Sequence, residues 1–292
     1  MADMQGKVCV VTGANSGIGK ATAQGLAASG ATVLMVCRDR ARGASAEQEI
    51  RVATGNTAVE LWQADLASLA DVRRLATELL AAHPLIHVLV NNAGVMVERR
   101  QMSADGFELQ FAVNHLAPFL LTRLLEPALA AAAPSRVVNV SSRVHAMGHV
   151  DFDDLQSTRK YRMFAAYGRS KLACVMATYD LAERWQALGI TVNCLHPGII
   201  DTNLGGMPGV IKKLLPKADK GARTSLYLAT APELADVTGQ YFSGGKPAKS
   251  SAESHDRAVR ARLWQETERM VGLWRPELTC PRPEKSITAG IR

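Results

Sequence analysis

The architecture of this chain is encoded most clearly near its start, in Val8-Cys9-Val10-Val11-Thr12-Gly13-Ala14-Asn15-Ser16-Gly17-Ile18-Gly19. The first four residues are apolar and mostly β-branched, which predicts a buried strand, and the Ala-rich residues 18–28 predict a helix. Glycines between a strand and a helix let backbone N–H groups approach an anion at the helix N-terminus. The loop therefore indicates a phosphate cradle, and a tight turn without a ligand is the alternative for these glycines alone.

Short apolar runs and helical segments alternate along the rest of the chain. Further strands are predicted at 32–36, 59–62, 88–90, 136–140 and 191–195, with a seventh at 239–242. Helices are predicted at 42–52, after the capping-box pattern Ser68-Leu69-Ala70-Asp71, within a long Ala/Leu-rich span through 133, and from the Tyr167 segment to about Leu188. The alternation predicts the α/β class, with a doubly wound parallel sheet of about seven strands and helices on both faces.

Composition excludes several classes of protein. Lys and Arg number 34 against 27 Asp and Glu, which gives a net charge of +7, but the basic residues are scattered. We therefore expect no nucleic-acid partner, and a mildly basic surface suits an anionic, phosphate-bearing ligand. No apolar run of about 18 residues occurs, so no membrane span is expected. Residues 1–7 lack a signal-peptide pattern, so we expect a cytoplasmic protein.

The five cysteines and the histidines do not suggest a metal site. The cysteine number is odd, no CxxC spacing occurs, and four of the five lie in apolar stretches, as buried reduced thiols do. His145 and His149 are four residues apart, but no carboxylate or cysteine completes a metal site at a recognised spacing. We expect no metal. His115 and His196 are expected to pack beside the ligand of the glycine loop.

Polar residues follow the predicted strands at the points where ligands bind in such sheets, which are the carboxyl ends of the strands. They are the glycine loop, Arg38, Asp65, Asn92-Ala93-Gly94, Ser142 and Pro197-Gly198. Six strand ends at one edge of the sheet are a stronger indication of a site than any one motif. Asp65 has an alternative role as a turn or cap carboxylate.

The end of the second strand favours one dinucleotide over another. A carboxylate there would accept from a ribose 2′-hydroxyl and repel a 2′-phosphate. Cys37 stands in that place, and the guanidinium of Arg38 can hold a 2′-phosphate through two charge-assisted hydrogen bonds. We therefore expect NADP(H) to be preferred over NAD(H). Asp39 is placed outside the pocket, and a solvated Arg38 is the alternative.

Tyr167 and Lys171 form a second chemical signature. Side chains four residues apart share one face of a helix, so the ammonium lies near the phenol and stabilises a phenolate. Beside a bound dinucleotide this pair suits proton transfer during carbonyl reduction or alcohol oxidation. An ordinary amphipathic helix is the alternative for the pair taken alone.

Together these motifs make the chain resemble the short-chain dehydrogenase/reductase family, a Rossmann-like family, over roughly residues 6–245. The resemblance is carried, in the family's order, by Thr12 to Gly19, Asn91 to Gly94, Ser142, Tyr167 to Lys171, and Pro197-Gly198. The phrases Cys37-Arg38-Asp39 and Gly239-Gln240-Tyr241-Phe242, with the long insert 145–162, resemble the retinol dehydrogenase and carbonyl reductase branch. We expect this chain to lack the N-terminal membrane anchor of the animal members.

The resemblance implies a role for each matching residue. Tyr167 would be the general acid in reduction, Lys171 would hold the nicotinamide ribose, Ser142 would orient the substrate oxygen, and Asn114 would keep a water in the proton relay. A purely structural role is the alternative for Asn114. The implied cofactor contacts are Gly13, Asn15, Ser16, Gly17, Ile18, Gly19, Arg38, Asp65, Leu66, Asn92, Ala93, Gly94, Tyr167, Lys171, Pro197, Gly198, Ile200 and Thr202.

The expected function is NADPH-dependent reduction of a lipophilic aldehyde or ketone, or the reverse oxidation. A tailoring ketoreductase of secondary metabolism is one alternative, and a non-catalytic NADP-sensing regulator is an alternative of another class. Family members commonly form dimers or tetramers, so we expect a homodimer or a homotetramer.

We expect one domain over residues 1–275, with a mobile tail at 276–292. Within the domain, residues 203–217 are expected to form a substrate lid, with a plain surface loop as the alternative. The last helix carries an apolar stripe at 259, 263, 270 and 274. Packing onto the domain is expected for that stripe, and a subunit interface or a pocket wall are the alternatives.

Overall fold

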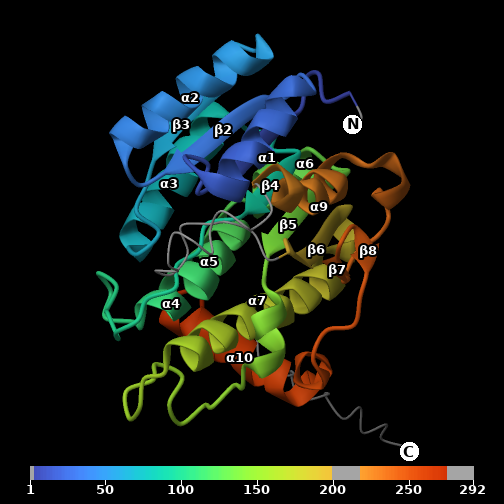
Figure 1. Cartoon of the computed structure of the whole chain (residues 1–292). Helices are drawn as coiled ribbons and strands as arrows, with labels where there is room; N and C mark the ends of the chain where they lie inside the picture. Colours follow the sequence, from blue (N-terminus) through green and yellow to red (C-terminus); the bar gives the residue numbers. More distant parts are fainter. Residues whose placement is uncertain (1–2, 199–217, 275–292) are drawn as a thin grey trace, which may run out of the picture.

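The computed structural model describes residues 3–198 and 218–274 of the chain (Figure 1). Its strands are β1 Val8–Thr12, β2 Thr32–Cys37, β3 Val59–Gln63, β4 Val88–Asn91, β5 Ser135–Val140, β6 Ile190–His196, β7 Tyr241–Ser243 and β8 Lys246–Pro247. Its helices are α1 Gly17–Ala28, α2 Arg40–Thr54, α3 Leu69–Ala82, α4 Leu109–Phe111, α5 Ala117–Leu124, α6 Glu126–Ala131, α7 Met163–Trp185, α9 Ala218–Thr230 and α10 Arg257–Met270.

The strands form one eight-stranded sheet in the order β3-β2-β1-β4-β5-β6-β7-β8. All neighbouring strands are parallel except β7 and β8, which are antiparallel. The direction of winding reverses between β1 and β4, so the loops after these two strands diverge to opposite faces and leave a crevice. The predicted doubly wound fold is confirmed, and the prediction of about seven strands missed the two-residue β8.

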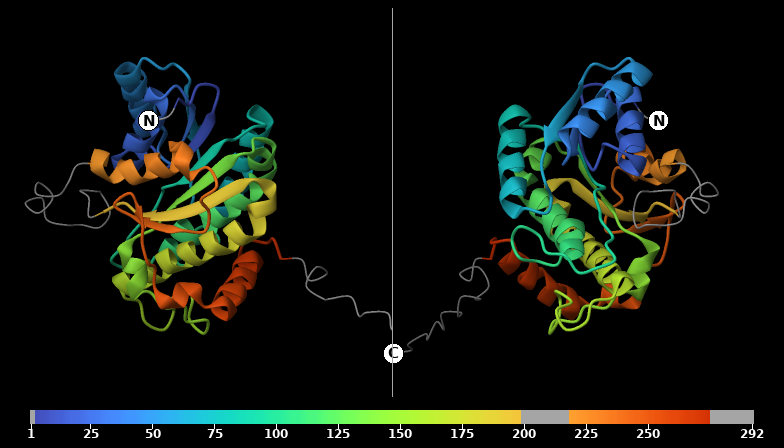
Figure 2. Two further views of the ribbon diagram at one scale, coloured as in Figure 1. Left: turned by 90° about the vertical axis from the view of Figure 1, so that its right-hand side faces the viewer. Right: turned by 60° about the vertical axis from the view of Figure 1, so that its left-hand side comes forward.

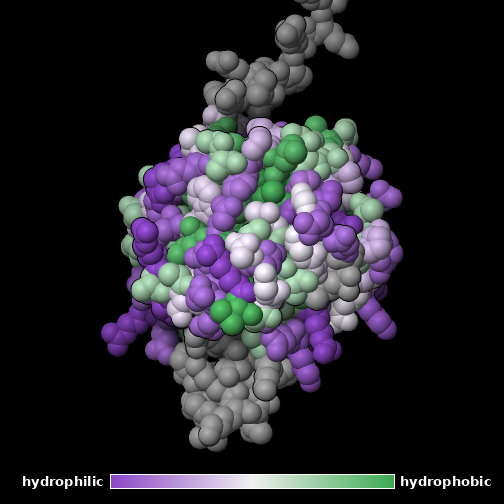
Figure 3. Space-filling model, turned by 90° about the horizontal axis from the view of Figure 1, so that it is seen from above, coloured by the Kyte–Doolittle hydropathy of each residue, from purple (hydrophilic) through white to green (hydrophobic). Residues whose placement is uncertain are grey.

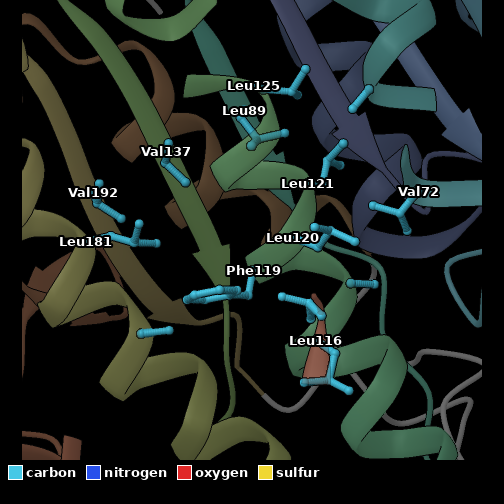
Figure 4. Packing of buried hydrophobic residues seen from close by; sticks show 14 of the residues in the cluster. Val72, Leu89, Leu116, Phe119, Leu120, Leu121, Leu125, Val137, Leu181 and Val192 are labelled. Carbon is cyan, nitrogen blue, oxygen red and sulfur yellow. The ribbon is translucent and has the colours of Figure 1, made fainter. Parts of the chain in front are cut away.

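Both faces of the sheet are covered by helices, which explains why the strands are apolar on consecutive residues. Alternate residues of one strand enter different cores: Val10 packs with α3, α5 and α7, whereas Cys9 and Val11 pack with α1, α2 and α9. Figure 4 shows the first core, to which α5 contributes Phe119 and Leu120 and the sheet contributes Leu89 and Val137. Four cysteines, Cys9, Cys37, Cys174 and Cys194, are buried free thiols, as predicted.

Local capping explains several helix boundaries. Ser68 caps α3 by accepting a hydrogen bond from the backbone N–H of Asp71, as the capping-box pattern predicts. The reciprocal half of the box is missing, because the Asp71 carboxylate accepts from the backbone N–H of Asp65 at 2.6 Å instead. The helix predicted to reach Leu188 is α7, which ends at Trp185 and continues as a 3₁₀ turn over Gln186–Leu188.

The C-terminal helix α10 lies outside α7, on the side away from the sheet (Figure 2). Of the stripe predicted to pack onto the domain, Leu263 is buried in the core that α7 shares, and Val259 and Met270 pack against that core. Arg260 of α10 is buried and pairs with Asp180 of α7 at 2.7 Å. Trp274 lies beyond the end of the helix.

On the face that Figure 3 displays, hydrophobic residues are scattered among hydrophilic ones. Within residues 3–198 and 218–274, no helix has both the length and the hydropathy needed to cross a bilayer.

Candidate active site

A cavity of about 490 Å³ opens at the crevice between the ends of β1 and β4. It brings together most of the residues predicted from the strand ends, and its lining residues range in the sequence from Gly13 to Pro197. The predicted residues that line it are Gly13, Asn15, Ser16, Gly17, Ile18, Gly19, Arg38, Asp65, Leu66, Asn92, Ala93, Gly94, Tyr167, Lys171 and Pro197. Separate sequence motifs therefore meet at a single site.

The glycine loop turns sharply and presents the N-terminus of α1 to the cavity. Gly13 and Gly17 have φ values of 67° and 53°, which side-chain-bearing residues rarely adopt. Gly19 is helical, but a Cβ there would collide with the Gly13 carbonyl oxygen and with the Asn92 side chain. The hydroxyl of Ser16, the N-cap residue, makes no capping hydrogen bond to the helix. The helix N-terminus therefore keeps donors and a positive dipole end that suit an anion.

Thr12 and Asn92 hold the two sides of the crevice together. The Thr12 hydroxyl accepts hydrogen bonds from the backbone N–H groups of Asn92 and Ala93, both at 3.0 Å. The Asn92 amide donates to the Thr12 carbonyl at 2.9 Å. The Asn-Asn-Ala-Gly motif thus fixes the end of β4 against the glycine loop, in addition to lining the cavity.

Three charged residues at the start of α2 line the far end of the cavity. Arg38 and Arg42 are exposed, and the Asp39 carboxylate caps α2 by accepting from the Arg42 backbone N–H at 3.0 Å. Our placement of Asp39 outside the pocket was wrong, because its position at the N-cap puts it on the cavity wall. Arg42 is a lining residue that the sequence analysis missed; its spacing of four residues from Arg38, at a helix start, could have indicated it.

Asp65 combines the two roles that the sequence left open. It lines the cavity beside Leu66, and its Oδ1 also accepts a hydrogen bond from the Ala67 backbone N–H at 2.9 Å. One oxygen of the carboxylate is therefore used in a turn.

Tyr167 and Lys171 project from α7 into the other end of the cavity. The Lys171 ammonium lies 5.8 Å from the centre of the Tyr167 ring. Lys171 is buried and donates to the Val140 carbonyl at 2.9 Å, which leaves two of its N–H groups without a partner among the described residues. A Cβ on Gly94 would lie 3.3 Å from the same ammonium. The ammonium thus lies between the tyrosine and the wall formed by the loop after β4.

Ser142 and Asn114 stand close to this end but are not among the residues that line the cavity. Ser142 follows β5, and its hydroxyl accepts from the Val144 backbone N–H at 3.3 Å. Asn114 lies in the π-helical turn Ala112–Leu116, where its side chain accepts from Val95 N–H and donates to the Val95 carbonyl and to Ser170. The side chain of Asn114 thus anchors the loop after β4 to α7. π-Helical turns of this kind occur frequently at functional sites.

The histidines take places that the sequence did not predict. His115 is buried against α10, where its Nε2 lies 2.8 Å from the Thr267 hydroxyl, so it does not pack beside the cavity. His196 also stands outside the cavity wall and accepts from the Arg143 backbone N–H. His145 is buried, whereas His149 is exposed and meets Glu253. In the part of the chain that the structure describes, no group of three metal-ligating side chains occurs.

Several predicted features lie outside the described residues: Ile200, Thr202, the lid at 203–217 and the tail at 276–292. Gly198 is described, with φ of 95°, but is not a lining residue. The sequence analysis also missed the apolar residues that line the cavity, which are Val36, Ala64, Val95, Met96, Val97, Val113 and Val140. Alternation along a strand places Val36 and Val140 there, but nothing local marks 95–97.

The residues present fit a dinucleotide. At Gly17 the place that a Cβ would take is open, with nothing within 4 Å of it, so the backbone at the helix N-terminus can be approached closely, whereas glycine at 13 and 19 lets the turn pack against Asn92 and Ala93. The cavity extends from two guanidinium groups, past a helix N-terminus, to a tyrosine and an ammonium. That order of groups suits a nucleotide phosphate, a pyrophosphate and a ribose.

A doubly wound sheet with such a crevice defines a dinucleotide-binding oxidoreductase as the class of protein. Residues 7–207 match the family model described as short chain dehydrogenase, and the chain belongs to that family, whose members use a nicotinamide cofactor. It is 46% identical to retinol dehydrogenase 13 of Homo sapiens over 95% of this chain and 88% of that protein. It is 42% identical to retinol dehydrogenase 14 of Homo sapiens over 92% and 88%.

Solved structures agree with the fold. An uncharacterised protein from Mycobacterium paratuberculosis superimposes with a TM-score of 0.79 at 33% identity, over 93% of this chain and 96% of that one. A metagenomic short-chain oxidoreductase in complex with NADP superimposes with a TM-score of 0.60 at 30% identity, over 82% and 96%. The expected resemblance to retinol dehydrogenases is confirmed.

Proposed function

We propose that this oxidoreductase uses NADPH to reduce a lipophilic aldehyde or ketone to the alcohol, or runs the reverse oxidation, with Tyr167 as the proton donor in reduction. The observation that carries the proposal is that one cavity is lined by the N-terminus of α1, by Arg38 and by the Tyr167–Lys171 pair. A binding-only protein would need the first two features and not the third. The bound nicotinamide supplies the hydride.

The chain's own groups would hold the cofactor along the length of the cavity. The backbone of residues 13–19 would bind the pyrophosphate, and Arg38 with Arg42 would bind a 2′-phosphate. Asp65 and Leu66 would contact the adenine. The two free N–H groups of Lys171 would bind the nicotinamide ribose, while its third holds it to Val140.

Proton transfer would take place at the phenol. The Tyr167 hydroxyl has no hydrogen-bond partner among the described residues, so it is free to donate its proton to the carbonyl oxygen as that oxygen gains negative charge. The nearby ammonium would stabilise the phenolate left behind. The Ser142 hydroxyl hydrogen has no acceptor in the same part of the chain and would orient the substrate oxygen.

The apolar wall near Tyr167 supports a lipophilic substrate. Val95, Met96, Val97 and Val113 line the cavity there, and apolar lining with a few polar groups is typical of sites for small organic ligands. The relatives named retinol dehydrogenase are consistent with an apolar alcohol or aldehyde of this kind. A homo-oligomer and a cytoplasmic location stay predictions.

The function is tested by measuring NADPH consumption against a panel of short aldehydes, retinal, steroid ketones and polycyclic aromatic ketones. We expect turnover of a bulky apolar class with kcat/KM at least about 10⁴ M⁻¹s⁻¹, and much slower turnover of short aldehydes. Tight NADPH binding without turnover of any carbonyl would contradict the proposal and favour a sensor.

Arg38→Ala is expected to weaken NADPH binding by about 100-fold and NADH binding by less than about threefold. Two charge-assisted hydrogen bonds to a 2′-phosphate account for a loss of this size, and NADH has no such phosphate. Dissociation constants from fluorescence titration check the expectation without turnover. Arg40→Ala is the matched control, because Arg40 is also exposed at the start of α2 but lines a different groove. Equal losses for both cofactors at Arg38 would refute the proposed preference.

A further inference from the structure

Two buried histidines meet one peptide group beside the candidate active site. His145 lies in the 3₁₀ helix Arg143–Met147, and its Nδ1 is 2.6 Å from the Ser142 carbonyl oxygen. His196 ends β6, and its Nδ1 is 3.2 Å from the backbone nitrogen of Arg143. The Ser142 carbonyl and the Arg143 N–H belong to the same peptide bond. The two rings therefore bind the two ends of the peptide group that directly follows Ser142.

The partners of each ring nitrogen define the tautomer of each ring. A carbonyl oxygen only accepts, so Nδ1 of His145 must carry a hydrogen, and its Nε2 must be bare because it accepts from the Ser251 backbone N–H at 3.1 Å. His196 is the reverse: its Nδ1 accepts from Arg143 N–H and must be bare, so in a neutral ring Nε2 carries the hydrogen, although this buried nitrogen has no partner among the described residues. Both rings are therefore neutral, with opposite tautomers.

Burial is consistent with neutral rings. His145 is 2% exposed and His196 is 6% exposed. Burial lowers the pKa of His196 to about 4, with further lowering from Arg143 and His145. Burial also lowers the pKa of His145, against the raising effect of its bond to Ser142. Another ionisable group beside the pair is Tyr241, whose ring centre is 4.8 Å from that of His145, and burial raises its pKa so that it stays a neutral phenol.

The clamped peptide controls the direction of the Ser142 side chain. Ser142 has an extended backbone with φ of −155° and ψ of 154°, and rotation of the following peptide changes ψ and with it the place of the hydroxyl relative to Tyr167. Misplacement of a positioning group by about 1 Å can cost on the order of 100-fold in rate. His145 also ties this peptide to Ser251, in the segment after β8, and His196 ties it to β6.

We propose that His145 and His196 are positioning residues that clamp the Ser142–Arg143 peptide and thereby fix the Ser142 hydroxyl for the substrate oxygen. The proposal rests on the function proposed above for Ser142. Neither ring lines the cavity, so the pair acts through Ser142 and not on the cofactor.

The test compares His145→Asn with His145→Gln. The Asn amide can donate from near the position of Nδ1 and keep the side-chain bond to the Ser142 carbonyl, whereas the Gln amide reaches the position of Nε2 and keeps only the Ser251 bond. In the Gln variant the Ser142 carbonyl then accepts only from the backbone N–H of residue 145, which is 3.1 Å away in the wild type. We expect kcat to fall about 100-fold in the Gln variant and less than about 10-fold in the Asn variant. The dissociation constant for NADPH should stay unchanged in both. His196→Asn and His196→Leu make the corresponding comparison at the N–H end of the peptide. Only the Asn side chain keeps an acceptor for the Arg143 N–H.

A double-mutant cycle separates positioning from general damage to the fold. In a Ser142→Ala background the Gln variant should cause no further loss of kcat, because the hydroxyl that the clamp positions is gone. An equal loss in both backgrounds, or wild-type kcat in the Gln variant, would overturn the proposal.

Imidazole ¹⁵N chemical shifts give a readout that does not depend on turnover. At pH 7 they should report hydrogen on Nδ1 of His145 and on Nε2 of His196, in the protein with and without NADPH. Swapped tautomers or a charged ring would overturn the clamp, even if carbonyl reduction is normal. Correct tautomers in a protein that turns over no carbonyl would instead overturn the proposed function, and with it the positioning role.

Discussion

We expect Tyr167→Phe to lower kcat for carbonyl reduction by about 10³-fold while leaving the dissociation constant for NADPH within about threefold. The substitution removes only the hydroxyl, and that hydroxyl has no hydrogen-bond partner among the described residues, so no buried group loses its partner. The ring stays beside the Lys171 ammonium, and the Tyr167 carbonyl keeps its bond from the Ser170 hydroxyl at 2.8 Å. Steady-state rates on the best carbonyl, with cofactor affinity from fluorescence titration, check both parts.

Tyr161→Phe is the matched control for this prediction. The Tyr161 hydroxyl donates to the Val97 carbonyl at 2.6 Å and accepts from the Gln110 amide at 2.7 Å, so it is a structural hydroxyl near the same cavity. We expect that variant to lose about 1–3 kcal/mol of unfolding free energy but to keep kcat within about tenfold. If Tyr167→Phe kept kcat within tenfold as well, another group would have to supply the proton.

The fold and most of the cavity could be predicted because their signals are local. The strands of a parallel sheet covered on both faces are continuous apolar runs, so the run 8–11 predicts a strand without knowledge of its contacts. The carboxyl ends of such strands converge by topology, so Arg38, Asp65 and Gly94 could be assigned to one edge before any contact was known. The strand β8 was not predicted, because the two residues Lys246–Pro247 are too few to show an alternating or apolar pattern.

Errors arose where a side chain had two possible partners. The capping-box pattern predicts that Asp71 accepts from the Ser68 N–H, but in the folded chain that N–H donates to the Asp65 carbonyl and the Asp71 carboxylate accepts from the Asp65 N–H. Asp39, which is expected outside the pocket from the sequence, is the N-cap of α2 and lines the cavity. Both choices depend on geometry at a helix start, which spacing alone does not fix.

The histidines show the limit of sequence reasoning most clearly. His145 meets Ser251, which is 106 residues away, and His196 meets Arg143, which is 53 residues away. The spacing in the sequence suggests only His149, four residues after His145, as a partner for a metal site. In the structure His149 contacts Glu253 instead. Contacts between residues so far apart in the sequence produce no local pattern. They depend on the tertiary arrangement of β6 and of the segment after β8 beside Ser142.

Gly19→Ala is expected to weaken NADPH binding by at least about 100-fold. Alanine is the better helix former by about 1 kcal/mol, so at an uncrowded site in α1 the change would stabilise the protein. At Gly19 the new Cβ collides with the Gly13 carbonyl oxygen and the Asn92 side chain, and the backbone oxygen can only yield if the whole turn shifts. Overpacking of this kind costs about 1–3 kcal/mol, and the shift moves the N-terminus of α1 away from the pyrophosphate.

Gly25→Ala tests whether the effect belongs to that contact. Gly25 is in the same helix, and its Cβ would meet the Leu226 side chain at 2.6 Å, which can rotate away as a backbone oxygen cannot. We expect this variant to bind NADPH within about threefold of the wild type, with a melting temperature that differs little. Wild-type NADPH affinity in Gly19→Ala would mean that the loop accommodates a methyl group and that close backbone approach at residue 19 is not what the cavity requires. A loss shared equally by both variants would trace the effect to the packing of α1 instead, because only Gly19 faces both the glycine loop and Asn92.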